Sequence, residues 1–251
     1  MRTLFAACVV LASFAGAAQA QPSAGEKVVA AMHDRYASTW YHTLTFVQKS
    51  TWYKPDGSEA RVQTWYEAAS FPGRLRIDIG EPSQGNGALF VNDSTIRIAG
   101  GKVTGATADP NDLLILGFDV YTQPVSRTAQ VLRAQGFDLT RTHRDTWEGR
   151  PVIVVGALAG DTTSKQFWVD ADRMLFVRLL DPGKGAGPVQ DVRFNTYERL
   201  GGGWLAEQVQ VLVGGHVVYQ EDYTDARVNV KLDPALWNAA TWSTARHWHT
   251  P

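Results

Sequence analysis

One stretch of the chain, SKQFWVDADRMLFVRLL from Ser164 to Leu180, carries large apolar side chains on both faces of what its pattern predicts to be a β-hairpin. Two apolar runs flank the polar interruption DADR, which is typical of a turn. A strand with one face in water alternates apolar and polar residues, so the second run, MLFVRLL, needs cover on both faces. More protein, a membrane or a bound ligand must supply that cover.

The rest of the chain has a helix, a strand meander, two short helices and a second meander. The first helix lies within 23–36, with Ser23 as its cap and Glu26 completing a capping box. The stretch DPNDLLILGFDVYT predicts a short apolar helix that begins at Asp109 or Asn111, and SRTAQVLRAQG predicts another. Strand-like segments separated by Gly, Pro and Asp turns fill most of the remainder, including one that starts at Phe137.

This layout predicts an α+β protein with one large antiparallel sheet of roughly ten strands, since strands grouped together with few helices favour that class. A sheet of this size curls, and short helices then cover its concave apolar face. We expect a single domain over residues 21–251, with a loosely held tail from about residue 243. Neither a linker nor a repeat interrupts it.

The N-terminal segment reads as a signal peptide. Arg2 precedes an apolar run too short to span a membrane, and AQA ends at Ala20 with small residues where cleavage requires them. We expect cleavage after Ala20 and export to a periplasm. The only cysteine, Cys8, lies early in the apolar run, so we do not expect lipidation there. The exported chain would then hold no thiol, which excludes disulfides and cysteine chemistry.

Composition and motifs argue against several functional classes. The formal net charge of -1 offers no basic field, so we expect no nucleic-acid partner. The sequence contains no Gly-x-Ser-x-Gly motif, which leaves a hydrolase as the weakest alternative. His247 and His249 have the spacing of a metal pair but stand in the expected tail, and Asp170 with Asp172 reads as a turn. We therefore expect no catalytic residues, no metal and no cofactor.

Several segments resemble, in order, the periplasmic lipoprotein carriers and their outer-membrane receptor, the LolA/LolB-like superfamily. These are STWYHTLTFVQKS with TWYEAASFPGRLRIDI, then GALFVNDSTIRI, DPNDLLILGF and KQFWVDADRMLFVRLL. The resemblance implies an unclosed, or half, β-barrel whose helical lid covers a cavity for acyl chains. One departure is Phe71, which stands before Pro72 where the carriers often have a basic residue tied to lid behaviour.

The resemblance also implies site residues. Those expected to line an apolar cavity are Leu44, Phe46, Trp65, Leu75, Ile77, Phe90, Ile96, Phe167, Val169 and Phe176. Those expected to form the lid are Leu113, Leu114, Ile115, Leu116 and Phe118. Since about 3.6 residues make a helical turn, the five lid residues cannot all face one side. Any one apolar residue of these sets can equally belong to an ordinary core, because strand periodicity does not say which face is concave.

The function implied is a carrier or chaperone that shelters the acyl chains of lipoproteins, or other lipids, on their way to the outer membrane. Its partners would be those lipids, an inner-membrane exporter and an outer-membrane acceptor, and we expect a monomer. The alternative is a non-enzymatic envelope sensor or scaffold with the same fold. An open apolar cavity would favour the carrier, and a filled interior the sensor or scaffold.

Overall fold

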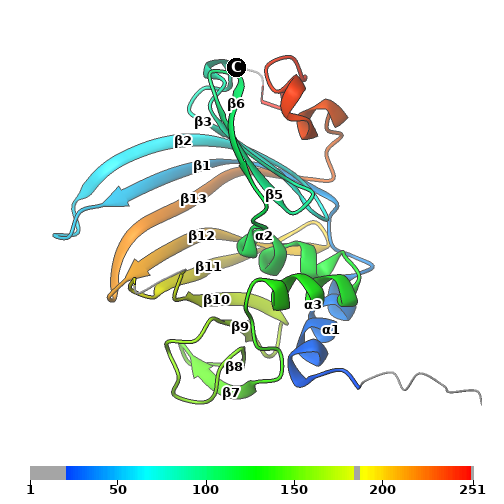
Figure 1. The fold of residues 1–251 in the computed structure, drawn as a ribbon, viewed down its shortest axis with the longest axis vertical. Helices are drawn as coiled ribbons and strands as arrows, with labels where there is room; N and C mark the ends of the chain where they lie inside the picture. Colours follow the sequence, from blue (N-terminus) through cyan, green and yellow to red (C-terminus); the bar gives the residue numbers. More distant parts are fainter. Residues whose placement is uncertain (1–20, 184–186, 250–251) are drawn as a thin grey trace, which may run out of the picture.

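The computed structural model describes residues 21–183 and 187–249; the expected signal peptide, with Cys8 and the cleavage point after Ala20, lies outside them. One antiparallel sheet of 13 strands runs through the whole described part, in the order β6-β5-β4-β3-β2-β1-β13-β12-β11-β10-β9-β8-β7. Between the described residues no pairing joins β6 to β7, so the curved sheet stays unclosed (Figure 1). The predicted α+β half-barrel is confirmed, and the expectation of roughly ten strands undercounts.

The strands of the first half of the sheet are β1 (Thr43–Tyr53), β2 (Glu59–Ser70), β3 (Arg74–Ile79), β4 (Gly87–Val91), β5 (Ser94–Ala99) and β6 (Lys102–Thr107). Those of the second half are β7 (Thr142–Trp147), β8 (Arg150–Val155), β9 (Gln166–Asp170), β10 (Leu175–Asp181), β11 (Gln190–Leu200), β12 (Gly203–Val213) and β13 (His216–Val228). The helices are α1 (Ala24–Tyr36), α2 (Asp112–Gly117) and α3 (Val125–Ala134), with short 3-10 turns η1 (Pro82–Gln84), η2 (Asp119–Tyr121), η3 (Pro234–Trp237) and η4 (Ala239–Thr241). None of the helices in the described ranges is both long and apolar enough to cross a membrane.

Helix α1 begins as the sequence predicts. Ser23 accepts a hydrogen bond from the Glu26 backbone, and the Glu26 carboxylate accepts one from the Ser23 backbone. At Gly25 the helix lies against the segment before β7, and its N–H donates to the Leu139 carbonyl at 2.8 Å. A Cβ at Gly25 would lie 2.6 Å from that carbonyl oxygen, so only glycine permits this approach.

The two apolar faces of the β9–β10 hairpin meet different parts of the protein itself. On one face Phe167, Val169 and Phe176 are fully buried in the main core, which the helices complete. On the other face Trp168 packs with Val177 and with Trp147 of β7 in a separate small core. The guanidinium of Arg178 stacks over both tryptophan rings, 4.1 Å from that of Trp147 and 4.5 Å from that of Trp168. No ligand is needed to cover this hairpin.

The helices cover only part of the concave face. Figure 1 shows α1, α2 and α3 gathered along one end of the strands, while the β1–β2 hairpin and the far ends of β12 and β13 curve away from them. Ring contacts such as that of Tyr36 in α1 with Tyr121 in η2, at 5.4 Å, hold the helical layer together. The site described below lies where this layer stops.

One local expectation was wrong. The segment from Phe137 is not yet a strand, because Asp138 accepts hydrogen bonds from the backbone and hydroxyl of Thr140 in a turn, and β7 begins only at Thr142. Trp242, just before the tail that was expected to be loosely held, is buried against β4 and β5.

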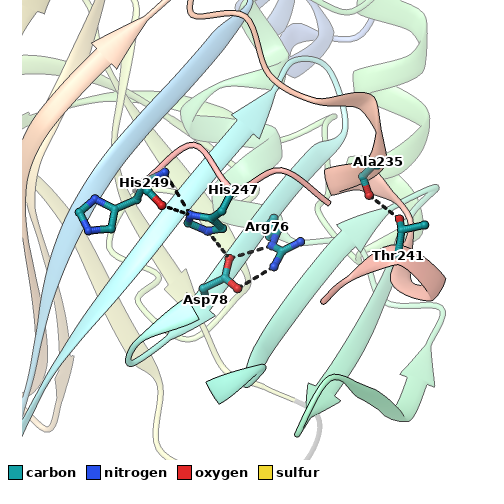
Figure 2. Close-up of polar contacts among 6 residues, drawn as sticks. All are labelled: Arg76, Asp78, Ala235, Thr241, His247 and His249. Atoms are coloured by element: carbon teal, nitrogen blue, oxygen red, sulfur yellow. Dashed lines mark hydrogen bonds and ion pairs between the residues drawn. The ribbon is translucent and has the colours of Figure 1, made fainter. Parts of the chain in front are cut away.

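Farther along the tail, His247 Nε2 lies 3.0 Å from Asp78 Oδ2 on β3 (Figure 2). Asp78 also accepts two hydrogen bonds from Arg76, at 2.7 and 2.8 Å. This buried group ties the tail to the convex face of the sheet, away from the helices.

Candidate functional site

The candidate site is a hollow on the concave face, between the strands around β1 and helix α2. Its lining comprises Leu44, Phe46, Gln48, Glu67, Ala69, Phe71, Leu75, Ile77, Asn111, Leu113, Leu114, Phe118, Phe194, Glu221 and Tyr223. Most of these side chains are apolar, and the polar ones come mainly from β1, β2 and β13. An apolar wall with a few convergent polar groups is the usual composition of a ligand pocket.

The register of the sheet explains why these residues meet. Phe46 pairs with Glu67, which pairs in turn with Ile77, so one row of side chains crosses three strands on the same face. The next row toward the helices joins Leu44, Ala69 and Leu75 in the same way. Alternation along each strand therefore sends the whole set toward α2.

The hollow is small, with a volume of about 70 Å³. Pockets that hold drug-sized ligands span roughly 300–1,000 Å³, and one water molecule takes about 30 Å³ of liquid. An acyl chain therefore enters only if α2 moves away from the sheet. Within the described ranges the segment joining β6 to α2, residues 108–111, belongs to no helix or strand.

The expected lid divides into two groups. Leu113, Leu114 and Phe118 line the hollow, whereas Ile115 and Leu116 point into the main core beside the other helices. Asn111 caps α2 by accepting hydrogen bonds from the backbones of Leu113 and Leu114. The helix is only six residues long, so neighbouring residues within one or two turns point either to the hollow or to the core.

The expected cavity residues also divide. Leu44, Phe46, Leu75 and Ile77 line the hollow. The others take different places, and Ile96 was assigned to the wrong face: it packs near Trp242 on the convex side. Its cross-strand partner is Leu89, which belongs to the same convex cluster. Successive side chains of a strand point to opposite faces, so an error of one residue places a side chain on the wrong face of the sheet.

The remaining expected residues stay on the concave face but away from the hollow. Phe167, Val169 and Phe176 are fully buried in the main core, and Phe90 packs at its edge. Trp65 lies one row farther from the helices, with its ring 5.9 Å from that of Trp52. These corrections share one cause, since the helices fill one part of the concave face and leave another part open.

Two acids in the hollow, Glu67 and Glu221, were missed by the sequence analysis. Glu67 is 4% exposed, and burial together with the nearby Glu221 raises the pKa of its carboxyl well above the usual range. Burial also raises the pKa of Glu221, although Tyr223 donates a hydrogen bond to it. The Tyr223 ring lies 4.4 Å from that of Phe46, which leaves the acids between aromatic and aliphatic walls. The sequence did contain a signal for Glu67. It stands between Trp65 and Ala69 at alternate positions of one strand, so it shares a face with apolar residues.

Two contacts hold the end of the lid to the β2–β3 turn. The ring of Phe118 stacks on that of Phe71, with centroids 5.0 Å apart and planes within 2°. Just beyond, the Gly73 N–H donates to Asp119 Oδ1 at 2.9 Å. Burial raises the pKa of Asp119 to about 7. Phe71, which stands where the carriers of the resemblance often have a basic residue, thus contacts Phe118 through an aromatic stack.

The other candidate polar groups are taken by structural contacts. Asp170 accepts hydrogen bonds from the backbones of Asp172 and Arg173, as the turn interpretation requires. His247 is bound to Asp78, and its ring contacts the His249 backbone rather than forming an imidazole pair. Across residues 21–183 and 187–249, no cluster of three or more acids, histidines or cysteines has a geometry suited to a metal ion.

A larger hollow of about 430 Å³ lies on the opposite face, around the β7–β8 hairpin. Its walls include Trp147, Arg150, Asp170 and Arg173. Asp170 and Arg173 are bonded to each other at 2.8 Å, and Arg173 is further held near the Tyr197 ring. Because Asp170 and Arg173 already pair with each other, this hollow is a weaker site candidate than the one under α2.

Solved structures show the fold of this chain in other proteins. A LolA superfamily protein from Nitrosomonas europaea is 10% identical with a TM-score of 0.52, over 86% of this chain and 97% of its own. An outer-membrane lipoprotein-sorting protein domain from Vibrio parahaemolyticus is 13% identical with a TM-score of 0.52, over 87% and 98%. A DUF1329 family protein from Desulfovibrio piger is 14% identical with a TM-score of 0.51, over 86% and 96%.

No protein-family model matches the sequence, and neither does any curated protein. The similarity therefore lies in the structure, and at these identities it establishes a shared fold. The half-barrel predicted from the sequence resemblance is the fold of these proteins.

Proposed function

We propose that this protein is a non-enzymatic carrier that shelters acyl chains of lipoproteins or other lipids beneath α2, in the periplasm and on the way to the outer membrane. The observation that carries the proposal is the apolar hollow closed by Leu113, Leu114 and Phe118 on the concave face of an unclosed barrel. The shared fold with a LolA superfamily protein and a lipoprotein-sorting domain supports it.

The energetics favour a lid that exchanges its own contacts for those of cargo. Each acyl CH₂ removed from water contributes about 0.8 kcal/mol. Opening α2 exposes Leu113, Leu114 and Phe118, and an acyl chain inserted in their place covers the same walls. A chain of a dozen carbons thus offsets the loss of several side-chain contacts without covalent chemistry.

Native mass spectrometry after gentle purification tests the proposal, with lipid extraction of the same sample. We expect a bound acyl-containing species that is lost on extraction. A fluorescent fatty acid then reports the site: Leu113→Asp should abolish its binding, while the matched control Leu158→Asp should leave it unchanged, because Leu158 is 60% exposed. Equal probe binding by both variants would contradict a site under α2.

The location and partners of the proposed carrier are tested separately. Cell fractionation should find the chain in the periplasm, beginning at Gln21, and size-exclusion chromatography should give a monomer. Crosslinking should then capture an inner-membrane exporter and an outer-membrane acceptor. A cytoplasmic chain that retains residues 1–20 would contradict the proposed location.

One observation favours the second candidate, a sensor or scaffold with the same fold. The hollow of about 70 Å³ is nearly filled by the protein's own side chains. A scaffold would keep α2 closed and act through its outer surfaces. Absence of any acyl species in the mass spectra, together with no binding of the fluorescent fatty acid, would support the scaffold over the carrier.

A further inference from the structure

The hollow under α2 contains an acid that nothing in the described protein satisfies. Glu67 as a whole residue is 4% exposed among apolar walls, and within residues 21–183 and 187–249 no hydrogen bond or ion pair involves its carboxyl. Buried polar groups are ordinarily hydrogen-bonded, and buried charges are paired, because water no longer compensates for them. A carboxyl that lines a hollow without a partner is therefore available to bind a ligand group there.

A second carboxyl faces the same space without a cation. Glu221 lies on β13, next to β1; it accepts a hydrogen bond from Tyr223, and the side chains of Tyr219 and Gln48 also lie against its carboxylate. The hollow's described lining includes no lysine, arginine or histidine. Its other polar members are the uncharged Gln48 and Asn111.

Polar side chains from β1, β13 and the start of α2 surround the two acids. From β1 the amide of Gln48 donates to Ser50 and to the hydroxyl of Tyr219. From β13 the phenols of Tyr219 and Tyr223 are the other titratable groups. At the start of α2, the side chain of Asn111 accepts hydrogen bonds from the backbones of Leu113 and Leu114. The residues that β3 and β11 contribute to the lining are apolar.

We propose that Glu67 and Glu221 form a head-group site for a cationic amphiphile, with a protonated amine between the two carboxyls and an alkyl chain toward α2. This inference rests on the proposed carrier function and specifies its cargo by charge. The volume of about 70 Å³ suits an ammonium group, although it is too small for a chain. The Tyr223 and Phe46 rings supply aromatic faces, which attract organic ammonium ions.

The chemistry requires the acids to ionise when the amine enters. Burial raises the pKa of both carboxyls, which disfavours their charged forms in the empty site. Binding of an alkylammonium ion favours the ionised carboxyls, so it should tighten as the pH rises. A neutral amphiphile displaces no proton and should bind with little dependence on pH.

Isothermal titration calorimetry with three probes tests the inference: dodecylamine, dodecanol and the short butylamine. On the wild type, dodecylamine should bind at least tenfold more tightly than dodecanol, since a hydrogen bond to a charged group contributes about 1.5–3 kcal/mol. Glu67→Gln and Glu221→Gln should each remove most of that difference. The matched control Glu59→Gln, at an exposed position of the same strand as Glu67, should behave as the wild type.

The outcomes separate the two proposals. Equal affinity for dodecylamine and dodecanol, unaffected by either glutamine variant, overturns the head-group site and leaves the carrier in place. Butylamine binding that depends on Glu67, with no binding of dodecanol, supports the site and overturns acyl carriage. Binding of none of the three probes overturns both.

Discussion

At the scale of single residues, the protein places ionisable groups where their protonation affects its stability. Asp119 is 3% exposed and holds the lid end to the β2–β3 turn through the Gly73 N–H. Burial raises the pKa of Asp119 from 3.8 to about 7. The folded state therefore binds a proton that the unfolded state releases between those values, and stability falls as the pH rises through that window.

Asp119→Asn should remove this pH dependence. Asparagine keeps an oxygen that can accept from Gly73 but carries no charge to bury. Since one pKa unit corresponds to 1.36 kcal/mol, we expect the variant to gain about 1–3 kcal/mol relative to the wild type at pH 8 and little at pH 4. Urea denaturation at both pH values measures the difference, with exposed Asp56→Asn as the control. A larger gain at pH 4 would contradict the sign of this argument.

Asp78 shows the opposite case. Burial acts to raise its pKa, but hydrogen bonds and charge from Arg76 and His247 outweigh that effect and hold the pKa of Asp78 below its usual value. Its stabilising contribution is therefore present above pH 3.8 and is lost as the pH falls through the lowered value. The Arg76 and Asp78 side chains are only 3% and 1% exposed, so neither can find water if its partner is removed.

Asp78→Asn should lower the free energy of unfolding by about 3–5 kcal/mol at pH 7, because it leaves a buried guanidinium without its counter-charge. Arg141→Gln is the comparison: it breaks an ion pair whose members are 47% and 41% exposed, and it should cost less than about 1 kcal/mol. Chemical denaturation compares the two. Replacing Arg76 by Met and Asp78 by Leu together should recover much of the loss. A similar loss of unfolding free energy in Asp78→Asn and Arg141→Gln would mean that the buried ion pair contributes no more to stability than the exposed one.

At the scale of elements, α2 lines the hollow with some side chains and packs into the main core with others. The hollow receives Leu113 and Leu114, while Leu116 is fully buried among the core residues on the other side. Gly117 lies close to β11, since a Cβ there would come within 3.2 Å of the Phe194 ring. The helix therefore cannot leave the sheet without losing core contacts as well as lid contacts.

A matched pair of truncations separates these two roles. Leu116→Ala should reduce stability by about 2–5 kcal/mol, as for other buried leucines. Leu113→Ala, from the same helix, should reduce stability by less than about 1.5 kcal/mol, because Leu113 is only partly buried. Fatty-acid binding at equal folded fraction should weaken in Leu113→Ala and persist in Leu116→Ala. The reverse pattern would place the site elsewhere.

The sequence predicted the positions of helices and strands better than the side of the sheet on which each side chain lies. Capping at Ser23 and Asn111 and the alternation along the strands identified the helix starts and nearly all strands. Strand parity could not be assigned from one sequence, because alternating apolar residues suit either face until the sheet's curvature is known. This is why Leu44 and Phe46 lie in the hollow, as expected, whereas Ile96 lies on the convex side.

The acids of the site show a second limit. Glu67 and Glu221 stand far apart in the sequence and approach only because β1 lies between β2 and β13 in the sheet. Pairing of the first strand with the last is a long-range event that local patterns do not encode. The resemblance pointed to the apolar segments that line the hollow, whereas the polar centre of the hollow required the topology.

At the scale of the whole molecule, the two meanders meet through one strand pair and one helical layer. β1 pairs with β13, and the helices lie on the concave side of that junction. The convex side has two small cores of its own, one beneath Trp168 and one beneath Trp242. Such a sheet is buried on both faces over part of its area, which explains apolar runs without strict alternation.

The C-terminal tail covers the second of these convex cores. Trp242 is 2% exposed and packs on Leu89 and Ile98, while Arg76 stacks 3.7 Å from its ring. The chain is held on both sides of this ring: Thr241 donates to the Ala235 carbonyl at 2.7 Å, and His247 reaches Asp78 (Figure 2). The tail therefore acts as a cover for β3, β4 and β5.

Truncation after Asp233 should accordingly destabilise the protein. Loss of a buried tryptophan alone costs about 3–5 kcal/mol, and each kcal/mol shifts the Tm of a domain of this size by about 2–4 °C. We expect the Tm to fall by about 10 °C, with increased binding of a hydrophobic dye to the uncovered strands. Trp242→Ala should reproduce most of the shift, and Ser243→Ala, at an exposed neighbour, should cause almost none. A truncated protein with an unchanged Tm would show that the tail is as loosely held as the sequence alone suggested.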